Sequence, residues 1–369
     1  MVAQILLWAV IAIVGVATVL VALRLSWHAA GIYLIRRAGP RPLVATRHVI
    51  WRDPGDVAGL DLQHGPGGQD LEPVAPFTFI EEHFSGSQPC VSVQDARGRR
   101  WRVKWGGEVR AENFAVRFVW ACGYFAETTY FFHSGTIEGA RDLQRASSCI
   151  ADDCSFKEAR FELEEPGART FFEEHSWAWN DNPFVGSPQL NGLKILAMLL
   201  SDWDTKDRRD VARGSNTAIF EHRLSRFRRE ARYLITDWGG SMGRWGGNVV
   251  TRGRWDPEGF EAQTPQFVTG LSDGFVQFGY SGQRTADIAL GITPSDVRWL
   301  MRYLGAITET QLREALDASG ASAEEQDRFA RALRARIEQL RDVSAPSSPL
   351  PAPRQARDRP ESSRRAASG

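Results

Sequence analysis

The sequence is poor in cysteine and has no surplus of charge of either sign. Its 369 residues include four cysteines, Cys90, Cys122, Cys149 and Cys154, too few for a scaffold built on disulfides. Cys149 and Cys154 could pair or share a metal, but no second cysteine or histidine pair stands at zinc spacing, so we interpret them as ordinary thiols. Lysine plus arginine and aspartate plus glutamate number 45 each. This balance gives no global field that favours nucleic acid, and we expect no nucleic-acid partner.

The beginning of the chain lacks charged side chains altogether. Val2 to Leu23 is an almost wholly apolar stretch, and roughly 20 such residues in a helix span a bilayer core. A cleaved signal peptide would have basic residues before a shorter apolar core, and a buried amphipathic helix would show a polar stripe, so we favour a retained single-pass anchor. The arginines that follow are Arg24, Arg36, Arg37, Arg41 and Arg47. Basic flanks tend to stay in the cytoplasm, which predicts a membrane protein whose domain is cytoplasmic.

Composition divides the chain into five segments. We assign residues 1–25 to the transmembrane anchor and 26–76 to a juxtamembrane linker, because HGPGGQDLEPVAP breaks periodic structure. Residues 77–165 and 166–342 are expected to form the two lobes of one folded domain. The tail, 343–369, is rich in Pro, Ser and Arg and is expected to be disordered.

The folded domain is expected to be α+β. Three antiparallel strands over 77–84, 90–94 and 100–105 are separated by the turn-like segments SGSQP and DARGR. A helix should follow over 107–122, then strands at ETTYFF and FELEE and a buried helix over 188–201. Strands over 216–220 and 233–236 flank the charged insert EHRLSRFRREAR. Further helices are expected near 294–304, 309–318 and 323–340.

Lys104 and Glu112 are the first candidate site residues. Lys104 ends the third strand in WRVKW and should face away from Val103 and Trp105. Phosphoryl transfer needs a cation on the nucleotide phosphates, although a solvated lysine at a sheet edge gives the same pattern. Glu112 falls within the apolar stripe of the next helix, where a carboxylate needs a buried partner. Lys104 is the obvious candidate for that partner.

A second set of candidates lies in SDWDTKDRRD, directly after the Leu-rich helix. Asp204 stands two positions before Lys206, as in a loop where a carboxylate orients the acceptor hydroxyl and a lysine neutralises the transferring phosphate. A charged surface loop that caps the preceding helix is the alternative interpretation. A magnesium ligand is expected a few residues on, where Arg209 and Asp210 stand. We favour Asn216, with RDVARGS bulging out.

The segment YLITDWGGSMGRWG supplies the last candidate. A β-rich run ends at Asp237, followed by an aromatic residue and Gly239. A carboxylate there would chelate magnesium that bridges the nucleotide phosphates, although Asp and Gly favour any tight turn at a strand end. The candidates follow one another in the order Lys104, Glu112, Asp204, Asn216 and Asp237. This order is more specific than any one motif.

From about Pro76 to Leu340 this order resembles the protein-kinase-like fold, nearer to atypical bacterial members such as the HipA-type toxin kinases than to ordinary protein kinases. The segments WRVKWGGE, LNGLKILAMLLSDWDTKD and YLITDWGGSMGRWG are also similar to a group of bacterial membrane-anchored proteins of unknown function. The resemblance implies a bilobal domain that binds ATP and Mg and transfers a phosphoryl group to an unidentified protein or small-molecule acceptor.

Two departures from the kinase pattern keep a second function open. SGSQP offers Gly86 as its only glycine where a kinase has a Gly-rich loop over the phosphates. Asp202 stands in the place of the catalytic-loop histidine of ordinary kinases. A catalytically inactive pseudokinase or binding scaffold is therefore the alternative to an active enzyme.

Two further features have competing interpretations. Thirteen tryptophans, including W-G-G triplets at Trp105, Trp238 and Trp245, could form a sugar-stacking surface. Their unequal spacing is no repeat, and we expect most of them in the core. The insert EHRLSRFRREAR could lie against anionic lipid or a phosphorylated target, but we favour a solvated charged helix.

Overall fold

The computed structural model describes residues 47–345 except 85, 87, 165–168, 172–175, 226 and 283–287. The expected anchor, Val2 to Leu23, and the tail after residue 345 lie outside this part of the chain. Within the described residues, no helix is long and apolar enough to cross a membrane. The anchor therefore stays a prediction.

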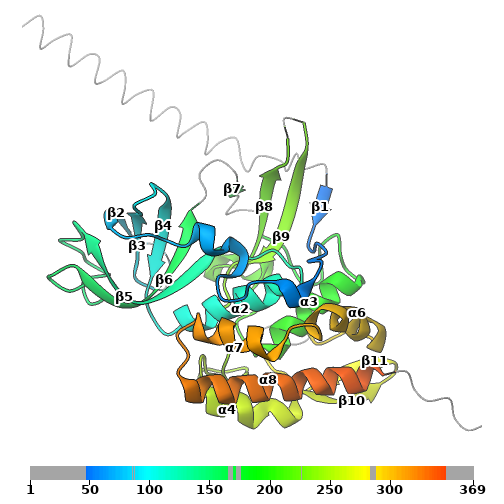
Figure 1. The fold of residues 1–369 in the computed structure, drawn as a ribbon. Coiled ribbons are helices and arrows are strands. Elements are labelled where there is room, and N and C mark those ends of the chain that lie inside the picture. The colour runs from blue at the N-terminus through cyan, green and yellow to red at the C-terminus, as the bar shows by residue number, and fades with distance from the viewer. Residues whose placement is uncertain are drawn as a thin grey trace, which may run out of the picture.

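The first half of the domain is a closed barrel, with strands in the order β2-β3-β4-β6-β5 (Figure 1). The strands are β2 (Phe77–His83), β3 (Cys90–Gln94), β4 (Arg100–Lys104), β5 (Thr129–Glu138) and β6 (Ser155–Glu164). The expected antiparallel pairing of the first three strands is confirmed. Alternate residues such as Val91, Trp101 and Phe161 are completely buried and fill the interior, which is the period-2 pattern of a strand with one buried face.

Helix α2 (Val109–Ala121) follows β4 and joins the barrel to the helical half. The Asn113 side chain makes this connection. Its Nδ2 donates to the carbonyl oxygen of Ala318 at 2.8 Å, and its Oδ1 accepts from the hydroxyl of Thr129, the first residue of β5, at 3.0 Å. Because both sides of α2 are covered in this way, almost every side chain of the helix is buried.

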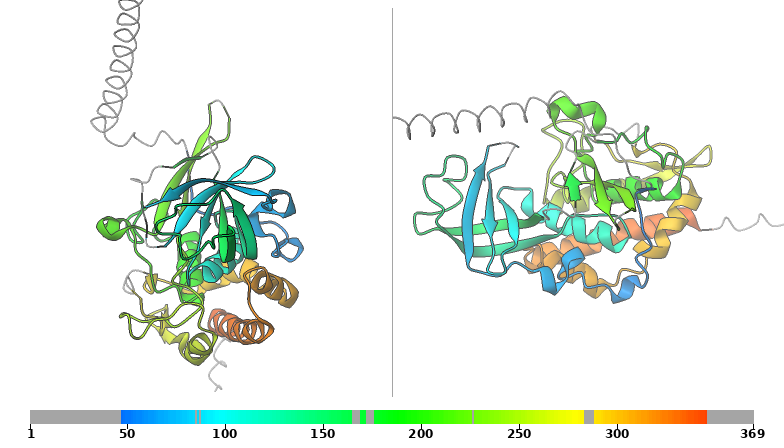
Figure 2. Two further views of the ribbon diagram at one scale, coloured as in Figure 1. Left: turned by 90° about the vertical axis from the view of Figure 1, so that its left-hand side faces the viewer. Right: turned by 90° about the horizontal axis from the view of Figure 1, so that it is seen from above.

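The second half is mainly helical and packs beside the barrel (Figure 2). Its helices are α3 (Pro188–Leu199), α4 (Pro257–Gln263), α6 (Pro294–Leu304), α7 (Glu309–Asp317) and α8 (Ala323–Ser344). Capping boxes begin α6, α7 and α8 at Thr293, Thr308 and Ser322, which explains why these helices start where the sequence predicts. The α+β class is thus confirmed.

Helix α3 is buried throughout from Leu190 to Leu199, as its composition predicts. Arg336 of α8 is buried beneath its end and donates to the carbonyl oxygen of Leu199 at 2.7 Å and to the Ser201 hydroxyl at 2.8 Å. The guanidinium also lies 3.6 Å from the centre of the Phe260 ring. These contacts fix the point at which the acidic loop leaves α3.

The charged insert is a hairpin and not the helix that we favoured. β8 (Thr217–Arg223) and β9 (Arg229–Ile235) pair along their whole length, so the two expected strands extend through the insert from either side. Charged side chains of the two strands form ion pairs: Glu221 of β8 accepts from Arg229 of β9 at 3.2 Å. A hairpin can therefore carry many charges, and composition alone misled the prediction. β1 (Arg47–Val49) and β7 (Arg169–Phe171) flank the hairpin, and β10 (Val268–Ser272) and β11 (Phe275–Phe278) form a separate one.

Residues 50–76, expected as part of the linker, form a strap that belongs to the fold. It contains the 3-10 turns η1 (Val57–Gly59), η2 (Gly65–Gly67) and η3 (Gln69–Leu71). Val57 and Leu62 are buried in the core. Gln311 Nε2 of α7 donates to the carbonyl oxygens of Val57 and Leu60, both at 2.8 Å. Glycine and proline exclude long helices here but permit short turns that expose backbone groups to such donors.

Gln311→Glu should loosen the strap selectively. The glutamate keeps the capping-box acceptor at the start of α7 but loses the two donors to the strap carbonyls, so we expect the free energy of unfolding to fall by about 2 kcal/mol. Amide exchange over residues 57–62 should accelerate more than elsewhere. Gln266→Glu changes an exposed residue and serves as the control. Equal stability of the two variants in urea unfolding would contradict this role of the strap.

Candidate active site

Four charged side chains form a ladder that links the barrel to α2. Lys104 Nζ of β4 lies 3.5 Å from Glu162 Oε2 of β6. Arg160 Nη2 of the same strand lies 2.8 Å from that oxygen and 3.1 Å from Glu112 Oε2 of α2. The chain of contacts therefore runs Lys104–Glu162–Arg160–Glu112, with cation and anion alternating. We call these four residues the charge ladder.

The expected direct contact between Lys104 and Glu112 is wrong. Lys104 faces away from Val103 as predicted, but its partner within 4 Å is Glu162 and not Glu112. Because β4 and β6 are neighbours in the barrel, the carboxylate of β6 reaches Lys104 first. Arg160 then stands between Lys104 and the buried Glu112, which is 3% exposed. The apolar stripe of α2 predicted the burial of Glu112 correctly.

Sequence reasoning missed Arg160 and Glu162 as site residues. The signal was present in RFELE, where charged and apolar residues alternate. In a strand this pattern places Arg160, Glu162 and Glu164 on one face. Which of these charges meets Lys104 depends on the pairing of β4 with β6, which the local sequence does not specify.

The pKa values of the charge ladder follow from burial and from its cations. Burial raises the pKa of Glu112 to about 7, against the opposing effect of Arg160 and then of Lys104. Burial acts on Glu162 in the same direction, but Lys104, Arg160 and Arg102 together outweigh it and lower the pKa of that carboxyl. The negative charge of Glu162 raises the pKa of Lys104. Lys104 and Glu162 are therefore both ionised at neutral pH.

The acidic loop after α3 holds the next candidates. Lys206 Nζ lies 3.2 Å from Asp204 Oδ2. Asn216, at the start of β8, donates from Nδ2 to the carbonyl oxygen of Asp204 at 2.6 Å. The structure thus brings Asp204, Lys206 and Asn216 together. Residues 208–213 form a 3-10 turn, η4 (Arg208–Arg213). This turn lies within the segment that we expected to bulge out before Asn216.

Arg209 and Asp210, the alternatives to Asn216, take part in another set of contacts. Arg209 Nε donates to Asp207 Oδ1 at 2.9 Å, and Asp210 lies within η4. Asp207 is completely buried and also accepts from the backbone N–H of Trp179. These contacts give Arg209 and Asp207 a structural role in holding the loop.

The loop that follows β9 packs against the acidic loop. A Cβ added at Gly240 would lie 2.7 Å from Asp202 Oδ1 and 3.0 Å from the backbone nitrogen of Asp204. Only glycine permits this approach, because real Cβ atoms do not come so close to other heavy atoms. Asp237 is half-buried, and its Oδ1 accepts from the N–H of Gly239 at 2.9 Å. Close packing against the acidic loop thus explains the second glycine of the W-G-G sequence after Asp237.

Two aspartates of these loops, Asp202 and Asp204, have raised pKa values, mainly because they are buried. Burial raises the pKa of Asp202 well above its ordinary value, and the charges of Asp204 and Asp237 add to this effect. Burial likewise raises the pKa of Asp204, where Lys206 opposes the shift and Asp237 adds to it. The charge of Asp237 also raises the pKa of Glu112. The charge of Asp237 thus acts on carboxyls of both the acidic loop and the charge ladder.

Gly86 lies in the turn between β2 and β3, at the end of the barrel where Lys104 sits. His83 pairs with Cys90, and Cys90 pairs with Lys104. The carbonyl oxygen of Gly86 accepts from Arg145 Nη2 at 2.8 Å. Gly86 thus lies near the end of the barrel that carries Lys104, and its carbonyl oxygen is engaged with Arg145.

The donor set of the acidic loops suits a hard divalent cation. Asp237 offers a carboxylate, and because the amide nitrogen of Asn216 is held by Asp204, its amide oxygen is the atom that could serve a metal. Magnesium prefers oxygen ligands and is commonly held by one or two protein groups together with nucleotide phosphates. Among the described residues, no group of three or more His, Cys, Asp or Glu side chains is arranged to hold a metal ion.

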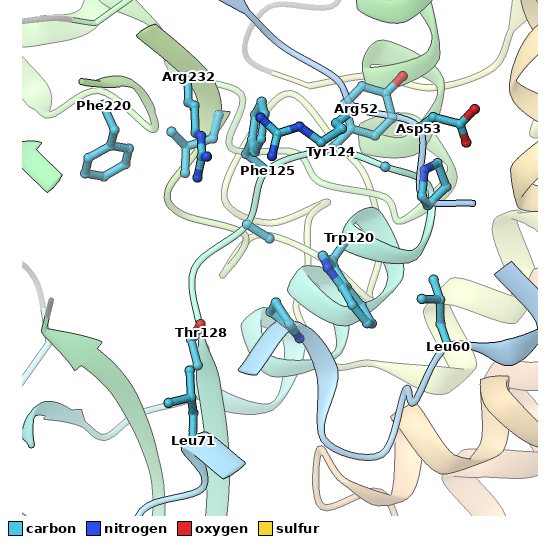
Figure 3. Close-up of a pocket in the computed structure, with 15 residues that line it drawn as sticks. Arg52, Asp53, Leu60, Leu71, Trp120, Tyr124, Phe125, Thr128, Phe220 and Arg232 are labelled. Atoms are coloured by element: carbon cyan, nitrogen blue, oxygen red, sulfur yellow. The ribbon is translucent and has the colours of Figure 1, made fainter. Parts of the chain in front are cut away.

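A pocket of about 350 Å³ lies elsewhere, between the strap, the end of α2 and the β8–β9 hairpin (Figure 3). Trp120, Phe125 and Leu60 form much of its apolar wall, and Arg52 and Arg232 stand beside Phe125. None of the predicted site residues lines it.

The tryptophans of the W-G-G triplets do not form a surface for sugar. Trp105, Trp238 and Trp245 are each at most 5% exposed. No tryptophan is among the exposed large hydrophobic residues of the described chain. The expectation that most of them belong to the core is confirmed for this part of the protein.

Comparisons with known proteins give a weak likeness to kinases. No family model and no curated protein matches the sequence. Two crystal structures of a Golgi casein kinase are similar: the form with Mn and ADP has a TM-score of 0.36 at 10% identity over 73% of each chain. The other has a TM-score of 0.34 at 12% identity over 74% of this chain and 75% of that one. An amicoumacin kinase bound to AMP-PNP and Ca²⁺ has a TM-score of 0.19 at 9% identity over 73% and 90%. TM-scores this low do not establish a shared fold. The role of the candidate site is therefore inferred from the geometry of its residues.

The raised pKa of Glu112 predicts a pH-dependent stability. The carboxyl of Glu112 keeps its proton up to about pH 7 in the folded protein, whereas in the unfolded chain it releases the proton near the ordinary pKa of 4.5. Stability should therefore fall as pH rises between these values, by on the order of 3 kcal/mol from this group. Glu112→Gln, which cannot ionise, should remove that contribution. Urea unfolding at several pH values checks the prediction, and parallel curves for wild type and Glu112→Gln would contradict it.

Proposed function

We propose that this chain is a membrane-anchored, kinase-like phosphotransferase that moves a phosphoryl group from Mg-ATP to a hydroxyl acceptor. One observation carries the proposal: the loop after Asp237 packs against both halves, because a Cβ added at Gly239 would lie 2.8 Å from the Glu108 side chain at the start of α2, and one added at Gly240 would lie 3.0 Å from the backbone nitrogen of Asp204. On this proposal a nucleotide cation, a metal carboxylate and an acceptor-orienting carboxylate would meet where the two halves join. This is the set of groups that phosphoryl transfer requires. We also propose that the chain is nearer to HipA-type kinases than to ordinary protein kinases.

The charge ladder would bind the nucleotide end of the substrate. Lys104 is the exposed end of the ladder, with 29% of its side chain accessible, and its charge is secured by Glu162. Arg160 and Glu112 are buried behind it and hold that carboxylate in place. Lys104 would therefore bind the α- and β-phosphates, and the other three residues would position it.

Asp204 and Lys206 would act at the acceptor. Both side chains are partly exposed and form an ion pair. Asp204 would accept the hydrogen bond of the acceptor hydroxyl and align its oxygen for attack, while Lys206 would offset charge on the transferring group. Asn216 holds the backbone of Asp204, so it would position this loop as well as serve the metal.

Asp237 and Asn216 would hold the magnesium ion that accompanies the nucleotide. When bound, such an ion neutralises charge on the phosphates and orients them. Asp204 and Asp237 both act on the charge of Asp202. Lys206 forms an ion pair with Asp204. A cation at Asp237 would therefore offset the negative charge that adds to the effect of burial on the pKa of Asp202 and Asp204.

A pseudokinase is the second candidate, because the turn between β2 and β3 is poor in glycine. The turn between β2 and β3 offers Gly86 as its only glycine, and the carbonyl oxygen of this residue is engaged with Arg145. Mass spectrometry of the purified chain after incubation with Mg-ATP distinguishes the two functions. New phosphorylated residues on wild type, absent in Asp204→Asn, support the enzyme, whereas nucleotide binding without phosphorylation of the chain or of added acceptors favours the pseudokinase.

Asp237→Asn and Asp204→Asn should fail in different ways. Nucleotide at about a hundred times its dissociation constant stabilises a folded domain by about 2.7 kcal/mol, a thermal shift of several degrees. Wild type and Asp204→Asn should show this shift only with magnesium, because Asp204 acts on the acceptor. Asp237→Asn should lose most of it, because the variant lacks the metal carboxylate.

The control for this experiment is Asp273→Asn, a change of the same kind at the exposed tip of the β10–β11 hairpin. It should behave like wild type in the thermal shift. If wild type itself shows no shift with any Mg-nucleotide, the proposed function fails.

The membrane topology is tested separately. The arginines that follow Val2 to Leu23 should keep the domain in the cytoplasm. A reporter that is active only in the periplasm, fused at Gly369, should therefore be silent, while the same reporter in a cytoplasm-active form should work. Clear periplasmic activity would reverse the orientation and remove the domain from its source of ATP.

A further inference from the structure

The tip of the β8–β9 hairpin presents apolar and cationic side chains together. Phe227 is 82% exposed and Leu224 is 46% exposed. The exposed cations beside them are Arg223, Arg228 and Arg229. The backbone N–H of Leu224 donates to the carbonyl oxygen of Arg228 at 2.9 Å. The apolar pair therefore stands on a hydrogen-bonded turn, and in Figure 1 the hairpin projects from the body of the protein.

The carboxylates of the hairpin offset only part of this charge. Within residues 221–232 the acidic side chains are Glu221 and Glu230, and both are buried. Glu221 accepts from Arg229 at 3.2 Å. Glu230 accepts from Arg232 at 2.6 Å and from Arg52 at 2.9 Å. The exposed charge of the described tip is thus positive.

The described chain begins at this same end of the molecule. β1 runs parallel to β9, with Arg47 opposite Glu230, so the exposed Arg47 lies next to the tip. The apolar stretch that we expect to cross the membrane ends at Leu23. The chain between Leu23 and Arg47 reaches at most about 80 Å when fully extended. This tether would bring the tip near the bilayer but would leave the domain free to turn.

We propose that the β8–β9 tip docks on the surface of an anionic lipid bilayer. Leu224 and Phe227 enter the headgroup region, and the surrounding arginines lie at the level of the lipid phosphates. Apolar side chains rimmed by arginine are the composition of protein surfaces that bind this interface. Contact at the tip, added to the tether at Arg47, fixes the orientation of the domain on the membrane. The proposal rests on the membrane anchor of the proposed function but not on phosphoryl transfer.

The β10–β11 hairpin provides a comparison within the same chain. It also exposes apolar side chains, with Leu271 55% and Phe275 42% accessible. Its turn carries Asp273, and residues 268–278 contain no lysine or arginine. If apolar exposure alone directed docking, both hairpins would bind lipid. If the arginines are required, only the β8–β9 tip should do so.

A fluorescent probe at matched serines tests the proposal in the full chain reconstituted into vesicles. Ser225→Cys places an environment-sensitive label such as NBD on the β8–β9 tip, and Ser272→Cys places it on the β10–β11 tip; both serines are exposed. Cys149 and Cys154 are replaced by serine, and Cys90 and Cys122 are buried. Vesicles contain phosphatidylcholine alone or mixed with phosphatidylglycerol, and unchanged melting confirms that each variant is folded.

With phosphatidylglycerol, the label at residue 225 should shift to the blue and brighten roughly several-fold, and added salt should reverse this. The label at residue 272 should not respond. Adding Arg223→Glu and Arg228→Glu to the 225 variant should abolish the response, whereas Arg331→Glu on the exposed face of α8 should not. An indifferent 225 label, or an equal response of both labels, would overturn the proposal. A response to inorganic phosphate with neutral vesicles would also overturn it, since it would indicate a phosphate site.

Discussion

The alternating contact of Lys104, Glu162, Arg160 and Glu112 is the constraint on which the rest of the site depends. Each of these charges, buried alone, would cost several kcal/mol. Linked in alternation, and with the pKa of Glu112 raised to about 7, they can be removed from water together. Since they come from β4, β6 and α2, their pairing sets the rotation of α2 against the barrel. It also leaves Lys104 as the member that faces outward.

The acidic loops have the opposite electrical character. Asp202, Asp204 and Asp237 lie near one another, and the pKa of the first two rises because burial and mutual repulsion favour the protonated form. The fold maintains this unfavourable arrangement through Gly240 and the buried Arg336. Strain of this kind persists where the surrounding structure over-determines it, and it is typical of functional sites. A cation shared by these loops would convert the repulsion into binding energy.

The sequence predicted those features that depend on local pattern. Strand alternation predicted the direction of the Lys104 side chain, and the apolar stripe of the following helix predicted the burial of Glu112. It did not predict Glu162 as the partner of Lys104, because that contact depends on the pairing of β4 with β6, strands far apart in the chain. The strap was taken for linker because glycine and proline exclude long helices, although its turns find a donor in Gln311. The β8–β9 hairpin was misjudged because its charges suggested a helix, whereas cross-strand pairs accommodate them.

The central claim is that the barrel and the helical half share one nucleotide site. A crystal structure with magnesium and a non-hydrolysable ATP analogue tests this most directly. Our account predicts the α- and β-phosphates at Lys104 and the metal at Asp237 and Asn216, with Asp204 facing the γ-phosphate. A nucleotide bound only in the pocket beside Trp120 (Figure 3), or a metal bound away from Asp237, would contradict it.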